Sequence, residues 1–161
     1  MSVPEDVLYG GVRELSNAIR ARRLSPVELA EAYLQRLEQY GPTLGAVVTV
    51  TRDRALREAR AAEREIAAGQ WRGPLHGVPY GVKDLLATAG DPTTWGAEPY
   101  RDQRFDFDAT IVRRLASAGA VLVALAWLLR RDLSRARAQL LFHYSLLYLA
   151  LLFVAMAIDV L

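Results

Sequence analysis

The feature that most constrains this chain is an uncharged run of nineteen residues near its end, Leu140 to Ile158. As a helix this run would extend about 28 Å, which is close to the hydrocarbon thickness of a bilayer. It is apolar on all sides, with Tyr144 and Tyr148 toward its N-terminal end. A helix buried in a protein core remains the alternative, but the preceding sequence offers little core to cover it. We expect a hydrophobic transmembrane helix over residues 140–161.

The segment before this helix, residues 125–139, is rich in arginine. It contains Arg130, Arg131, Arg135 and Arg137. The positive-inside rule places this juxtamembrane flank in the cytoplasm, where the arginines can bind anionic lipid. We therefore expect residues 1–124 to be cytoplasmic and anchored in the cytoplasmic membrane, with the lipid bilayer as a partner.

Composition and the remaining motifs exclude several kinds of site. The net charge is only +2, so nucleic acid is not an expected partner. The chain has no cysteine, and His76 and His143 lack a matching set of carboxylates, so we expect no metal site. His76 should instead form a hydrogen bond within its own loop. Trp71 and Trp95 are expected to be packing residues, and no motif indicates a cofactor.

The first two thirds of the chain are predicted to alternate between helices and strands. Ser25 is expected to cap a helix that starts at Pro26, with Glu28 completing a capping box. Gly41 and Pro42 are predicted to end this helix.

Further elements follow in the same alternating pattern. The predicted elements are a buried strand over 45–50, a helix over 52–69 ending at Gly69, a short strand over 80–82, a helix capped by Asp108 with an apolar stripe of Ile111, Val112 and Leu115, and a buried strand over 120–123. This order indicates an α/β fold with helices that cover a sheet.

Lys83, in the segment GVPYGVKDLL, is the only lysine in a chain with nineteen arginines. Arginine keeps its proton at any working pH, whereas a lysine that is buried or close to other cations can lose its proton and act as a general base. Chance, or an ion pair with a carboxylate such as Asp84, would also explain a lysine here. Both explanations stay open from the composition alone.

The surrounding motifs carry a family resemblance. The segment GPLHGVPYGVKDLLATAGDPTTWGAEPY and the later FDFDATIVRRLASAGAVLVA resemble the N-terminal portion of the amidase signature family, which includes one subunit of glutamyl-tRNA amidotransferase. The resemblance extends over about residues 8–124. It implies an incomplete amidase-type mixed sheet flanked by helices, and a small amide as the substrate of the parent family.

The resemblance also implies a mechanism. Amidases of this family hydrolyse amides with a Ser–Ser–Lys triad, in which the lysine is the base, and Lys83 matches that lysine. The two serines should follow the strand VLVA in a Gly/Ser-rich loop, but none of the six serines in this chain lies in such a loop. We therefore predict a truncated amidase-family protein that keeps Lys83 and has no activity alone.

The C-terminal tail resembles a second family. The segment ARAQLLFHYSLLYLALLFVAMAIDVL is similar to the last helix of heme O synthase, the protoheme IX farnesyltransferase, with the join between Gly119 and Trp127. The acidic prenyl-transfer motifs of that family are not in this segment, so no prenyltransferase chemistry is expected. Three hypotheses remain: an inactive amidase fragment, a membrane-anchored binding protein that is not an enzyme, and an accidental gene fusion.

Overall fold

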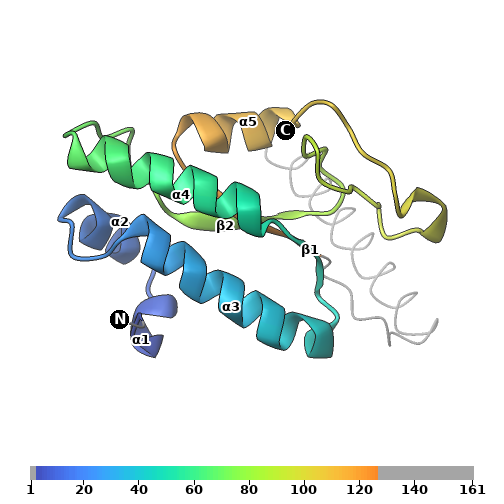
Figure 1. Ribbon diagram of the computed structural model, residues 1–161, viewed down its shortest axis with the longest axis horizontal. Helices are drawn as coiled ribbons and strands as arrows, with labels where there is room; N and C mark the ends of the chain where they lie inside the picture. Colours follow the sequence, from blue (N-terminus) through green and yellow to red (C-terminus); the bar gives the residue numbers. More distant parts are fainter. Residues whose placement is uncertain (1–2, 127–161) are drawn as a thin grey trace, which may run out of the picture. The chain divides into compact units, whose positions relative to one another are not determined.

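The computed structural model describes residues 3–126, and Figure 1 shows them as helices packed around a small sheet. The helices are α1 (Glu5–Leu8), α2 (Val12–Arg20), α3 (Pro26–Leu44), α4 (Arg52–Ala67), α5 (Thr110–Ser117) and a 3-10 turn at Glu98–Tyr100. The strands are β1 (Val47–Val50), β2 (Pro79–Lys83) and β3 (Val121–Ala126). The predicted α/β class, a mixed sheet flanked by helices, is confirmed for these residues.

The sheet has the strand order β1-β3-β2, so β3 is its central strand. β3 pairs antiparallel with β1 and parallel with β2. The parallel pair needs a crossover connection, and α5 lies in that connection. Every residue of β3 except Ala126 is buried, as predicted for this strand from its continuous apolar sequence.

The two faces of the sheet have separate cores. Val121 and Val123 pack with residues of α3 and α4, the two long helices that lie side by side in Figure 1. Leu122 and Leu125 pack with Val112 of α5. Tyr80 pairs with Leu122 and Gly81 with Ala124, so β3 has one extra residue at this point. Because of this irregularity, Leu122 and Leu125 share a face although they are three positions apart.

The predicted start of α3 is confirmed, but its predicted end is wrong. Ser25 Oγ accepts hydrogen bonds from the N–H groups of Val27 and Glu28, and it donates to Glu63 of α4. The helix continues through Gly41 and Pro42 to Leu44. One proline near a helix end removes a single backbone donor, and the helix ends instead at Gly45, which has a φ of 60°.

The strand predicted over residues 45–50 is shorter and less buried than expected. It begins at Val47, because Gly45 ends α3, and it forms an edge of the sheet. Three of its four residues are only partly buried, and Val48 is exposed. A short apolar run does not show whether its strand will be central or at an edge.

The predicted cap of α5 is also wrong. The helix begins after Ala109, and no side chain caps it. Asp108 binds Arg54 and the N–H of Ala89 instead. Within the predicted apolar stripe, Val112 is fully buried, whereas Ile111 is 47% exposed because only one side of this short helix meets the sheet.

None of the helices in residues 3–126 is long and apolar enough to cross a bilayer. The predicted transmembrane helix over 140–161 lies outside the described residues. The predicted juxtamembrane segment, 125–139, also lies outside them except for its first two residues, which belong to β3.

Candidate functional site

The predicted base, Lys83, is the last residue of β2 and is exposed. Its register partner is Ala126, the last residue of β3. Because the two strands are parallel, their carboxyl ends meet at the same edge of the sheet. Lys83 and Ala126 therefore lie side by side at this edge.

Side chains alternate across the sheet at this strand end. Val82 and Asp84 are buried, whereas Lys83, between them, is exposed. Consecutive side chains of an extended chain point to opposite faces, so this pattern sends the Lys83 side chain away from the core.

Asp84 connects the end of β2 to the loop that follows it. Asp84 Oδ1 accepts a hydrogen bond of 2.8 Å from the N–H of Thr94, and Oδ2 accepts one from the Thr94 hydroxyl. The Asp84 carbonyl accepts from the N–H of Trp95 at 3.1 Å, and the Asp84 N–H donates to the carbonyl of Ala126 at 3.1 Å. Asp84 therefore holds both β3 and the 94–96 loop next to Lys83.

Trp95 lies in that loop with a strained backbone. Its φ is 51°, a left-handed conformation that is uncommon outside glycine, and the residue is 41% exposed. Its ring contacts Tyr100 and Phe105, with centroid distances of 5.0 and 6.2 Å. Trp95 is thus both a packing residue, as predicted, and part of the surface near Asp84. Trp71 packs against a buried cluster in the way that the sequence predicts.

The described serines lie toward the opposite end of β2 and β3. Ser16 is buried in α2, whose residues pack against Val78, just before β2. Ser25 bonds to Glu63, and its neighbour Pro26 lies against Gly77, also before β2. Ser117 ends α5, four residues before β3 begins, and its hydroxyl donates to the carbonyl of Arg113. The length of β2 alone separates this end from Lys83 by about 13 Å.

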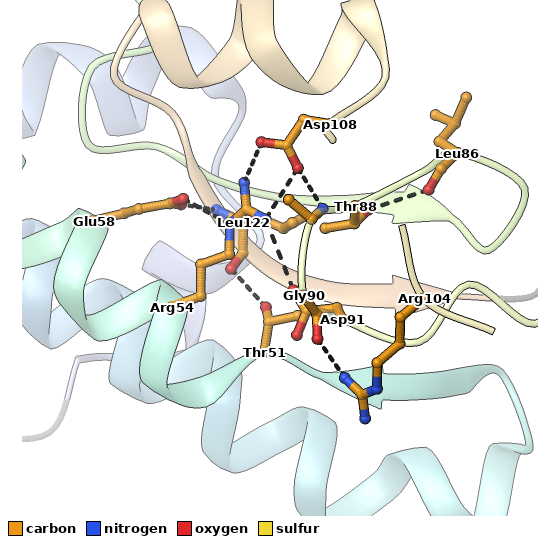
Figure 2. Close-up of polar contacts among 11 residues, drawn as sticks. Thr51, Arg54, Glu58, Leu86, Thr88, Gly90, Asp91, Arg104, Asp108 and Leu122 are labelled. Atoms are coloured by element: carbon orange, nitrogen blue, oxygen red, sulfur yellow. Dashed lines mark hydrogen bonds and ion pairs between the residues drawn. The ribbon is translucent and has the colours of Figure 1, made fainter. Parts of the chain in front are cut away.

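A second polar cluster is centred on Arg54 of α4, and it was not predicted from the sequence. Arg54 pairs with Glu58 at 2.8 Å, Asp108 at 3.0 Å and Asp91 at 3.7 Å. Figure 2 shows Arg54 between Glu58 and Asp108. These residues come from α4 and from two loops that are distant in the sequence, so no local signal indicates that they meet.

Burial and charge shift the pKa values of this cluster in different directions. Burial raises the pKa of Asp91, whereas hydrogen bonds from Arg54 and the Ala89 N–H outweigh burial and lower the pKa of Asp108. Burial would lower the pKa of Arg54, but its bonds to Asp108 and Glu58 raise it. The charges therefore stabilise one another, which is expected of a structural ion-pair network along an open groove.

The same network holds α4 to the central strand. Thr51 Oγ1 donates to the carbonyl of Leu122 at 2.7 Å, and Glu58 accepts from the Leu122 N–H at 2.9 Å (Figure 2). Tyr80 packs nearby, and burial raises the pKa of its hydroxyl to about 12. A phenol with so high a pKa remains protonated at neutral pH, so it carries no charge here.

His76 forms the hydrogen bond predicted within its loop. It is fully buried, its Nδ1 accepts from the N–H of Arg72 at 3.2 Å, and its Nε2 lies 3.1 Å from a carboxylate oxygen of Glu65. Burial lowers the pKa of His76. Among residues 3–126, no three His, Asp or Glu side chains are grouped as metal ligands.

Comparisons with known proteins agree on one family. Residues 28–128 match the model of the family described as Amidase. AmiD of Mycobacterium tuberculosis, described as a putative amidase, is 46% identical over 110 residues, which are 68% of this chain and 23% of AmiD. The acylamidase of Rhodococcus erythropolis is 39% identical over 110 residues, again 68% of this chain and 23% of that protein.

A solved structure gives the same result. The native peptide amidase from Stenotrophomonas maltophilia matches with a TM-score of 0.66 and 41% identity, covering 71% of this chain and 24% of that enzyme. The chain thus spans about a quarter of the length of the relatives that it matches. The resemblance of the tail to heme O synthase lies outside the described residues and stays a prediction.

Proposed function

The chain belongs to the amidase family, and we propose that its residues 3–126 are the part of an amidase that holds the general-base lysine, Lys83, and that they do not hydrolyse amides on their own. One observation carries this proposal. Lys83 ends β2 beside Ala126, whereas the serines of the described region lie toward the other end of these strands.

The distance matters because of the chemistry of serine. A serine hydroxyl attacks an amide carbonyl only when a base within about 3 Å takes its proton. The described serines lie toward the other end of β2, a strand about 13 Å long. Two of them, Ser25 and Ser117, already use their hydroxyls in hydrogen bonds to other groups. Lys83 therefore needs a nucleophile from outside residues 3–126, either elsewhere in this chain or in another chain.

The proposed substrate class is an amide. Proteins of the amidase family act on amide bonds, and the peptide amidase PAM has been solved with the competitive inhibitor chymostatin. This chain is 41% identical to that enzyme over 71% of its own length. The family match, residues 28–128, contains Lys83.

A chimera tests the role of Lys83. Residues 1–126 would replace the matching segment of the S. maltophilia peptide amidase, and amide hydrolysis would be measured. We expect an active chimera whose kcat falls roughly 10²–10⁴-fold in Lys83→Arg, because arginine keeps the positive charge but cannot act as a base. If a folded and active chimera kept its kcat after Lys83→Arg, Lys83 would not be the base.

The chain itself provides the second half of the test. The full 161-residue chain should release no product from the same amide. Hydrolysis by this chain that disappears in Lys83→Ala would contradict the proposed inactivity.

We also propose that the chain is anchored in the cytoplasmic membrane. The uncharged run Leu140 to Ile158 and the arginines before it support this. Fractionation tests it, because an anchored chain stays with the membranes after an alkaline wash. Recovery of a monomer from the supernatant would contradict anchoring. Sequencing across the codons for residues 119–127 would separately reveal an accidental fusion.

A further inference from the structure

Asp84 has an environment that packing alone does not explain. Its side chain is fully buried at the end of a strand, where an apolar residue would cost least. A carboxylate is tolerated there because Thr94 provides two donors, its N–H at 2.8 Å and its hydroxyl. The Thr94 hydroxyl oxygen also accepts from the N–H of Gly96 at 3.1 Å, which fixes its orientation.

These contacts determine the position of Lys83. On one side of Lys83, Val82 is buried in the core that faces α5. On the other side, Asp84 donates to Ala126 and accepts from Trp95 through its backbone, while Thr94 holds its carboxylate. With both neighbours held, the backbone of Lys83 has little freedom, and its side chain leaves the sheet in one direction.

We propose that Asp84, held by Thr94, is a positioning residue that fixes the backbone of Lys83 at the edge shared with Ala126. The inference rests on the proposed function of Lys83 as a base. A base must lie within about 3 Å of the proton that it takes, and a displacement of about 1 Å costs roughly 10²-fold in rate. An anchored strand end supplies that precision.

The single lysine makes the proposal measurable. In the full 161-residue chain, made with ¹⁵N-lysine and held in detergent micelles, Lys83 gives one backbone amide signal. Its order parameter should be about 0.85, the value of a rigid backbone, and should fall toward about 0.6 in Thr94→Val. Thr94→Ser keeps the hydroxyl and should restore the rigid value.

The chain offers a matched control one residue away. Thr93 is also fully buried, but its hydroxyl has no hydrogen-bond partner among the described residues. Thr93→Val therefore makes the same isosteric change without removing a hydrogen bond, and it should leave the order parameter of Lys83 at about 0.85. Asp84→Asn, which keeps one acceptor oxygen, serves as the second variant if Thr94→Val does not fold.

A purely structural role for Asp84 predicts a different result. In that case Thr94→Val and Asp84→Asn would lower the thermal midpoint while Lys83 stayed as rigid as in the wild type, and the proposal would be wrong. This outcome is distinct from failure of the proposed function, which is decided by the response of the chimera to Lys83→Arg. If Lys83 became mobile in Thr94→Val while the activity of the chimera did not respond to Lys83→Arg, the positioning role of Asp84 would be supported. The role of Lys83 as a base would then be wrong.

Discussion

Lys83 and Ala126 lie opposite each other as the last residues of two adjacent parallel strands. The Asp84 N–H bonds to the Ala126 carbonyl at 3.1 Å and joins the two strand ends. The last described residue of β3 is therefore held next to the lysine. This relationship is the structural basis of the proposed role of Lys83 as a base at this edge of the sheet.

Replacement of Arg54 by Ala should destabilise the fold strongly. The Arg54 side chain is only 14% exposed and pairs with three carboxylates, which would be left partly buried without a counter-charge. We expect the free energy of unfolding to fall by about 3 kcal/mol, measured by urea denaturation. Arg101→Ala, which removes an exposed pair with Glu98, should change it by less than about 1 kcal/mol. Equal effects of the two changes would contradict the buried network.

The stability should decrease when the pH falls below neutral, because of His76. Burial lowers the pKa of His76 in the folded chain below its value of about 6.5 in an unfolded chain. Above about pH 6.5 the imidazole is neutral in both states, and below it the unfolded chain binds more protons, so stability is lost. Thermal midpoints from pH 8 to pH 5 would show this loss.

The matched variant for this prediction is His76→Gln, which does not titrate in this range. Its midpoint should change less between about pH 7 and 5 than that of the wild type. Hydrogen bonds from Arg72 and Arg54 lower the pKa values of Glu65 and Asp108, respectively, despite burial. These two carboxylates therefore lose their contribution to stability only at more acidic pH. An identical slope in the variant and the wild type would rule out His76 as the cause.

Replacement of Gly119 by Ala should destabilise the fold more than the same change at Gly69. Both glycines have a left-handed backbone, with φ values of 78° and 80°. A Cβ at Gly119 would lie 2.3 Å from Cδ2 of His76, whereas a Cβ at Gly69 has nothing within 4 Å. We expect losses of about 3 kcal/mol for Gly119→Ala and about 1 kcal/mol for Gly69→Ala by chemical denaturation. Similar losses would mean that His76 moves aside without cost.

Replacement of Ser25 by Ala should weaken the start of α3. Ser25 Oγ accepts from two backbone N–H groups of the first turn and donates to Glu63. Its removal should cost about 1 kcal/mol. Ser117→Ala, at the exposed end of α5, removes only a bond to a helix carbonyl and should change stability by less than about 0.5 kcal/mol. A neutral Ser25→Ala would show that the cap is not needed.

Local signals in the sequence predicted much of the fold. Ser25 and Pro26 marked the start of α3, Gly69 marked the end of α4, and the apolar run before Ala126 marked a buried strand. Each of these signals acts over a few residues, so the reason for the structure is contained in the neighbouring sequence. The motifs around Lys83 likewise indicated the amidase family, which the comparisons confirm.

Other features depended on partners that are distant in the sequence. Asp108 has the position of a helix cap, yet it pairs with Arg54, 54 residues earlier. The sequence identified Lys83 as a candidate base but could not show that it ends its strand beside Ala126 or that Thr94 holds its neighbour Asp84. Residue types and local spacing determine which elements form. Only the packing of those elements decides which charges and hydrogen-bonding groups meet, because that choice depends on distances through space.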